Sequence, residues 1–195
     1  MEFERRTRGC PWCLLLCDNP RGRESLARLL YRYIQHRYPQ RPLVLSRVSA
    51  DEGRTKVACD MAVVLHTAAR RWLGTSPFDN LDPDSLSTPN LERLISETIR
   101  SFHQSLVRER WPTFVVVLDN VTESTATQST LSLLRRIISA EDMVWIVFAP
   151  RTVCDISDPL GSSPFYNIFS VHDLSNWSGQ RNPQQAGVSG WRERL

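Results

Sequence analysis

Five apolar residues follow one another without interruption from Phe114 to Leu118, and the run ends at Asp119. The run is rich in β-branched residues and does not alternate with polar ones, which predicts a strand buried on both faces. Such strands lie inside parallel sheets, because crossover helices cover both faces of these sheets. We therefore expect a central strand over 114–118, with Asp119 at its carboxyl end, the edge where ligands bind in α/β folds.

Apolar runs and helical periodicities alternate along the rest of the chain. We expect further strands at 11–17, 43–48 and 144–148, and the weaker apolar segment 165–171 predicts an edge strand. We expect helices at 23–37, at 57–73, from Thr88 to just before Pro112, and at 127–139. This alternation predicts an α/β fold, in which a parallel sheet of about five strands lies between two layers of helices.

The first helix carries an apolar stripe at the spacing of one helical face, which we expect to pack on the sheet. Its residues are Leu26, Leu29, Leu30, Tyr33 and Ile34. Before this helix, the Asn19-Pro20 pair and Gly22 predict a turn over 18–22.

The chain of 195 residues is long enough for one domain, which we place at 11–175. An arm at 1–10 precedes this domain, and a tail at 176–195, rich in Gly, Gln and Asn, is expected to be disordered. No apolar run approaches the roughly 18–20 residues that span a bilayer. The amino terminus has no signal-peptide pattern, so we expect a cytoplasmic protein with no membrane partner.

The basic residues are almost all arginine, since Lys56 is the single lysine among 24 basic residues. The arginines are spread over helices that also carry acids and do not form a stripe, so we do not expect a nucleic-acid partner.

Five cysteines form an odd set that does not suggest a disulfide framework: Cys10, Cys13, Cys17, Cys59 and Cys154. Cys10 and Cys13 form a C-x-x-C pair, which leaves a thiol-redox protein as one alternative. A thioredoxin-like pair would open a long helix, whereas this pair leads into an apolar strand. No second pair lies at the spacing of a zinc site.

A phosphate-binding loop would lie at the first junction between strand and helix. The pattern G-x-x-x-x-G-K-S/T, laid over this junction, falls on Cys17, Gly22, Arg23 and Glu24, followed by Ser25. Only the second glycine matches the pattern. Because Lys56 is the single lysine, no intact loop of this kind lies elsewhere in the chain.

Three motifs in order resemble the nucleotide-binding domain of STAND-class P-loop NTPases, of the NACHT and nephrocystin-3-like amino-terminal type known from fungal signalling proteins. The first is the degenerate loop at Cys17. The second is the Walker B strand, which ends in D-A-L-D-E in that family and here continues from Asp119 to Glu123 as D-N-V-T-E. The third is the sensor strand, where T-S-R is replaced by Ala149-Pro150-Arg151. The resemblance covers 11–175.

The resemblance implies a P-loop fold with ATP and magnesium as ligands. Asp119 would hold the magnesium ion, Glu123 would polarise the attacking water, and Arg151 would sense the γ-phosphate. The nucleotide would contact the residues of the degenerate loop, namely Cys17, Gly22, Arg23, Glu24 and Ser25.

The departures from the family pattern predict weak or absent nucleotide binding. Arg23 is a planar fork and does not replace a compact lysine ammonium. A Glu24 carboxylate about 4 Å from a phosphate costs about 4 kcal/mol at an effective dielectric constant of about 20, unless it binds the magnesium ion itself. We hypothesise that Asp18 and Glu24 fill the phosphate site at the helix amino terminus.

We therefore expect a regulatory or protein-interaction module that acts through protein partners or by self-association. A divergent but active ATPase that uses Asp119 and Glu123 with magnesium is the alternative, and a thiol-redox protein built on Cys10 and Cys13 is the second.

Overall fold

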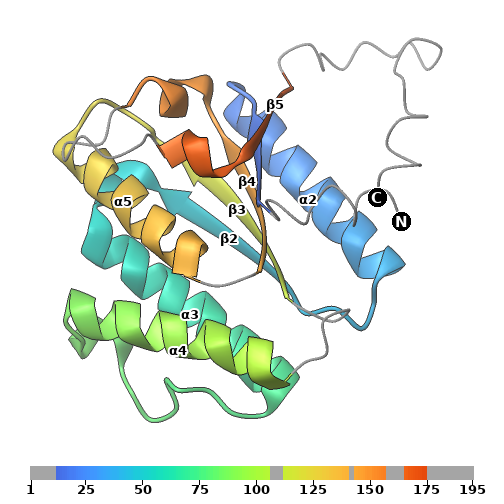
Figure 1. The fold of residues 1–195 in the computed structure, drawn as a ribbon, viewed down its shortest axis with the longest axis vertical. Helices are drawn as coiled ribbons and strands as arrows, with labels where there is room; N and C mark the ends of the chain where they lie inside the picture. Colours follow the sequence, from blue (N-terminus) through green and yellow to red (C-terminus); the bar gives the residue numbers. More distant parts are fainter. Residues whose placement is uncertain (1–11, 106–111, 141–142, 157–164, 175–195) are drawn as a thin grey trace.

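The computed structural model describes residues 12–105, 112–140, 143–156 and 165–174. Within these residues five parallel strands form one sheet in the order β2-β3-β4-β1-β5 (Figure 1). The strands are β1 (Trp12–Leu16), β2 (Leu43–Ser49), β3 (Thr113–Asp119), β4 (Val144–Ala149) and β5 (Ser170–Asp173). The predicted α/β fold with a five-stranded parallel sheet is confirmed.

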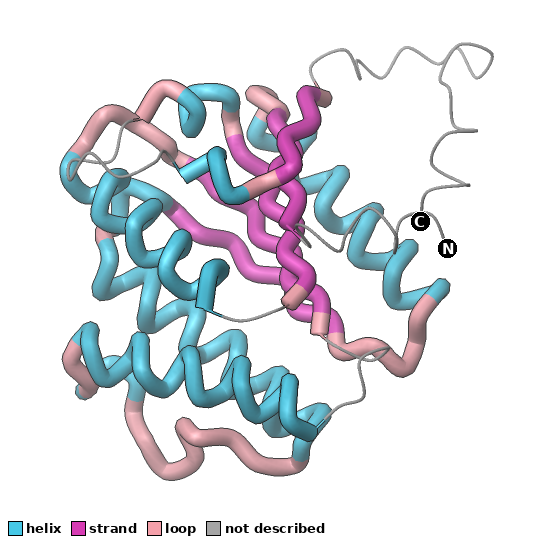
Figure 2. The backbone as a smooth tube through the Cα atoms, in the orientation of Figure 1, coloured by secondary structure: helices cyan, strands magenta, loops and turns pink. Residues whose placement is uncertain are grey.

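The helices lie on both faces of the sheet (Figure 2). They are α2 (Pro20–Arg37), α3 (Arg54–Leu73), α4 (Thr88–Ser105) and α5 (Thr125–Ala140). The short 3₁₀ segments are η1 (Ala50–Glu52), η2 (Pro83–Ser85), η4 (Arg151–Cys154) and η5 (Phe165–Ile168). The connection from β1 to β2 runs across the sheet in the opposite direction to the later ones, so a right-handed crossover places α2 on the face opposite α3, α4 and α5.

Alternate residues of the central strand β3 face the two helical layers. Phe114 and Val116 belong to the core beneath α3, α4 and α5, whereas Val115 and Val117 pack in the smaller core beneath α2. All seven residues of β3 are buried, as expected for a strand covered on both faces. By the same alternation, Asp119 is on the α2 side of the sheet.

The first helix begins earlier than predicted. The expected start was near Arg23, but α2 begins at Pro20. Asn19 is its N-cap residue, and its Oδ1 accepts hydrogen bonds from the backbone N–H groups of Arg21 (3.1 Å) and Gly22 (3.2 Å). Proline at the first helical position has no N–H to satisfy and a suitable φ. The connection from β1 to α2 is therefore confined to 17–19, and Gly22 lies inside the helix.

The predicted apolar stripe of this helix is wrong for two of its residues. Leu29 is 61% exposed and Tyr33 is 44% exposed, whereas the buried residues of α2 are Arg23, Ala27 and Ile34. The helix is rotated about its axis relative to the prediction, so that Arg23 faces the sheet. Hydrophobic periodicity alone does not reveal this rotation, because it requires an arginine to be buried.

The other helices agree more closely with the sequence. The buried residues of α4 are Leu91, Leu94, Ile95, Thr98, Ile99 and Phe102, and those of α5 include Leu131, Leu134, Ile137 and Ile138. Helix α3 begins at Arg54, three positions before the expected start at 57. Segment 165–171 is only partly a strand, because Phe165–Ile168 forms a 3₁₀ turn and β5 begins at Ser170. The predicted arm 1–10 and tail 176–195 lie outside the described residues.

None of the described helices combines the length and the apolar character that crossing a bilayer requires.

The buried indole of Trp145 provides a test of the core. Its ring stacks on Phe114 at 4.6 Å between centroids, and its Nε1 has no hydrogen-bond partner in the described part of the chain. Trp145→Phe should change the free energy of unfolding by less than about 1.5 kcal/mol, because the lost volume is offset by removal of an unpaired N–H group. Trp145→Ala should cost about 3–5 kcal/mol.

Urea unfolding measures both effects, and Trp12→Phe is the matched control. Trp12 Nε1 donates to the Met143 carbonyl oxygen at 3.1 Å, so this variant loses a hydrogen bond worth about 1 kcal/mol. Equal destabilisation by Trp145→Phe and Trp145→Ala would contradict the expectation.

Candidate functional site

The residues predicted to form a site gather at the carboxyl ends of three adjacent strands. The connection that leaves β1 leads to α2 on one face, and the connection that leaves β4 leads to η4 on the other. A crevice at the carboxyl ends of strands is expected where connections diverge in this way. The loop 17–19 follows β1, Asp119 ends β3, and Arg151 follows β4 directly.

Arg23 and Asp119 form an ion pair in the centre of this edge. Arg23 donates to Asp119 Oδ1 from Nε (3.2 Å) and from Nη2 (2.6 Å). Its Nη1 donates to the backbone carbonyl oxygens of Cys17 (2.7 Å) and Asp18 (3.2 Å). The Arg23 side chain is only 3% exposed. This guanidinium therefore joins the loop after β1 to the end of β3.

A second arginine contacts the other oxygen of the same carboxylate. Arg47, near the end of β2, donates from Nε to Asp119 Oδ2 at 2.8 Å, while its side chain remains 68% exposed. Both carboxylate oxygens of Asp119 thus accept hydrogen bonds from guanidinium groups. A magnesium ion at Asp119 would compete with these arginines for the carboxylate oxygens and would lie next to two positive charges.

The amino terminus of α2 is closed by its own residues. In a phosphate loop the backbone N–H groups of this region point at the ligand. Here the side chain of Asn19 accepts hydrogen bonds from two of these groups. Gly22 has a packing role, because a Cβ atom at this position would lie 3.3 Å from Asn19 Cβ and 3.4 Å from Cys17 Sγ.

The two residues predicted to follow the phosphate loop lie at the surface. Glu24 Oε1 accepts hydrogen bonds from Arg28 Nη2 (2.7 Å) and Nε (3.1 Å), and Ser25 is exposed. Asp18 Oδ1 accepts a hydrogen bond from the backbone N–H of Arg151 at 2.8 Å. Arg23, rather than Asp18 or Glu24, therefore extends to the strand end that carries Asp119.

Arg151 links β1 and β5, the two neighbouring strands at one edge of the sheet. Its Nη2 donates to Asp173 Oδ2 at 2.6 Å, and its Nε lies 3.7 Å from Asp18 Oδ2. The hydrogen bond to Asp173 is the main cause of a raised pKa of the Arg151 guanidinium. Arg151 is thus held by carboxylates that follow β1 and end β5.

Glu123 lies in the turn between β3 and α5 and is exposed. No hydrogen bond or ion pair joins its side chain to another residue in the described part of the chain. The neighbouring Asn120 has a φ of 53° and donates from Nδ2 to Ser49 Oγ at 2.8 Å. The turn is anchored to β2 through Asn120, while the Glu123 carboxylate is not positioned by any such contact.

Charged contacts extend along the carboxyl edge of all five strands. One group joins Arg47, Asp119 and Arg23, and a second joins Asp18, Arg151 and Asp173. Neither Arg47 nor Asp173 was among the predicted site residues. Arg47 interrupts the apolar residues of β2 at a position that faces the same side of the sheet as Asp119. This charged residue within an apolar strand was the signal that could have predicted its contact with Asp119.

The cysteines and the metal-ligand residues that the structure describes form no further site. Burial raises the pKa of the Cys13 thiol to about 11, so it is protonated at neutral pH. Cys10 lies outside the described residues. Within the described ranges, no group of three or more His, Cys, Asp or Glu side chains is placed to hold a metal ion.

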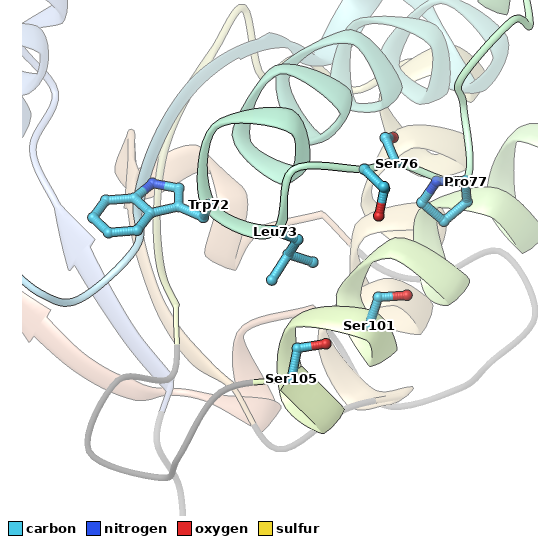
Figure 3. Close-up of a pocket in the computed structure, with 7 residues that line it drawn as sticks. Trp72, Leu73, Ser76, Pro77, Ser101 and Ser105 are labelled. Carbon is cyan, nitrogen blue, oxygen red and sulfur yellow. The ribbon is translucent and has the colours of Figure 1, made fainter.

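A separate hollow lies at the opposite edge of the domain, where α3 and α4 end (Figure 3). Its described lining consists of Trp72, Leu73, Thr75, Ser76, Pro77, Ser101 and Ser105. None of these side chains is charged. The hollow is not part of the charged edge around Asp119.

No model of a known protein family matches the chain, and a comparison with curated proteins finds none that is similar to it.

The buried ion pair predicts a marked difference between two variants. Asp119→Asn should lower the free energy of unfolding by about 3–5 kcal/mol, because it leaves the buried Arg23 charge uncompensated. Arg47→Ala should lower it by less than about 1 kcal/mol, because that side chain is largely in solvent. Chemical denaturation measures both, and equal losses would contradict the central role of the Arg23–Asp119 pair.

The raised pKa predicts slow alkylation of Cys13. With a pKa of about 11, about one thiol in a thousand is ionised at pH 8. The alkylation rate at Cys13 should therefore rise about tenfold per pH unit between pH 7 and 9 without a plateau. Peptide mass spectrometry after timed iodoacetamide treatment follows this site, and a plateau below pH 8 would support a reactive thiol.

Proposed function

We propose that this chain is a degenerate P-loop NTPase-like domain, of the NACHT/STAND type suggested by its motifs, and that it is a regulatory or protein-interaction module. In this proposal the domain has lost productive binding of ATP and magnesium. The strand order, with the degenerate loop after β1, Asp119 on β3 and Arg151 after β4, agrees with this assignment.

The observation that carries the proposal is the position of Arg23. In a P-loop site the corresponding lysine contacts the β- and γ-phosphates, and the carboxylate on the Walker B strand helps to hold magnesium. Here the guanidinium binds this carboxylate directly and also binds two carbonyl groups of the loop. The protein itself supplies contacts between the two elements that a bound nucleotide and metal ion would otherwise join.

Hydrolysis would require further elements that the site does not hold in place. A general base must lie within hydrogen-bond reach of the attacking water. Glu123 has no contact that would orient its carboxylate, and Arg151 is already bound to Asp173. These observations favour a role in binding other proteins over a role in catalysis.

Thermal unfolding with ATP and magnesium tests the proposal. We expect the midpoint to move by less than about 1 °C at about 5 mM ligand, whereas saturation at about 100 times the dissociation constant would add about 2.7 kcal/mol and several degrees. Magnesium alone and ATP alone serve as controls. A rise of several degrees that needs both ligands would overturn the proposal in favour of an active nucleotide site.

Phosphate release provides the matched catalytic test. Glu123→Gln should leave the stability unchanged within about 0.5 kcal/mol, because the side chain is exposed and has no partner in the described structure. We expect the wild type and this variant to release phosphate at the same background rate. A wild-type rate well above that of Glu123→Gln would support the divergent ATPase.

A further inference from the structure

The outer surface of α2 has an apolar centre with a positive margin. Leu29 and Tyr33 are exposed one helical turn apart, and Arg32 and Arg37 lie on either side of them around the helix. In the described residues neither arginine forms an ion pair with a carboxylate. We call Leu29, Arg32, Tyr33 and Arg37 the α2 surface.

A complementary surface lies on the loop between α3 and α4. Leu81 is an exposed large hydrophobic residue, and Asp82 and Asp84 follow it, both exposed. Neither aspartate belongs to an ion pair among the described residues: Asp82 caps η2, and Asp84 accepts a hydrogen bond from Cys59. We call Leu81, Asp82 and Asp84 the acidic loop.

The acidic loop is held in a fixed shape. Phe78, which is fully buried, anchors it, and the Leu81 backbone N–H donates to the Phe78 carbonyl oxygen at 3.0 Å. Asn80 has a φ of 67°, so the chain turns sharply just before Leu81. A loop that is already ordered loses less conformational entropy when it binds.

The two surfaces cannot meet within one molecule. Helix α2 lies on one face of the sheet, and the acidic loop joins the two helices α3 and α4 on the other side (Figure 1). Each surface has an exposed apolar centre and two charges that form no ion pair among the described residues, and the charges of the two surfaces are of opposite sign. The acidic loop of a second copy of the chain therefore matches the α2 surface.

We propose that this domain self-associates head to tail, with the acidic loop of one copy against the α2 surface of the next. Because this contact joins two different surfaces, an open assembly of several copies has a free α2 surface at one end and a free acidic loop at the other. A single loop on a single helix makes a small interface, so the expected dissociation constant is on the order of 10⁻⁴ M. The proposal specifies the partner for the interaction role proposed above, but it does not depend on the loss of nucleotide binding.

Charge reversal on each surface, followed by mixing, tests this pairing. The first variant is Arg32→Glu with Arg37→Glu, and the second is Asp82→Arg with Asp84→Arg. Each alone should weaken self-association at least about tenfold, because like charges then face each other. An equal mixture should associate again, because the reversed α2 surface then meets the reversed loop and the unchanged pair also remains available.

Sedimentation velocity from about 10 to about 500 μM measures the association, and a higher salt concentration should weaken it. Leu81→Ser and Leu29→Ser should also weaken it, whereas Val63→Ser, at an exposed position of α3, should leave it unchanged. If a charge-reversed variant fails to fold, these uncharged variants still test the proposed contact.

Three results would overturn the proposal. They are a wild type that remains monomeric over this range, self-association that both reversed variants retain, and a mixture that does not associate. Any of them would leave the response to ATP unaffected, so the two proposals fail separately.

Discussion

The arrangement of this domain depends on the buried contact between Arg23 and Asp119. Placing two charges in a protein interior costs several kcal/mol for each ion, and only close pairing with further hydrogen bonds offsets this cost. Arg23 satisfies these conditions, because it makes two hydrogen bonds to the carboxylate and two to carbonyl groups of the loop after β1. The pair links α2, the loop after β1 and the central strand, and it fixes the rotation of α2 about its axis.

The rotation of α2 determines which of its residues are buried in the core and which are exposed at the surface. With Arg23 facing the sheet, Ala27 and Ile34 follow it into the core, and Leu29 and Tyr33 lie on the outer side. An uncharged residue at position 23 would remove the requirement for this orientation. The hydrophobic periodicity would then favour turning Leu29 inward. The same buried charge thus opposes a metal ion at Asp119 and exposes the apolar residues of the α2 surface.

Much of the fold could be predicted because it depends on local patterns. The continuous apolar runs of β3 and β4 and the stripes of α4 and α5 correspond to buried elements in the structure. The start of α2 differs from the prediction because Pro20 and Gly22 are typical of a turn, whereas Asn19 caps the helix immediately before Pro20. The rotation of α2 was missed because it depends on Asp119, which lies 96 positions away along the chain. For the site, sequence motifs identified Asp119, Arg23 and Arg151 as candidates, but they did not predict that the arginines would bind carboxylates of this same chain.

The contact also bears on how such a domain could be regulated. A ligand changes a conformational equilibrium only if it binds one state more tightly than the other. In a nucleotide switch the phosphate and the metal ion supply this difference at the ends of β1 and β3. Here the Arg23 side chain makes the corresponding connection within the molecule, with no nucleotide present. Under the proposed loss of nucleotide binding, control of this domain would act through its outer surfaces, where the concentration of a partner or of the chain itself determines which contacts form.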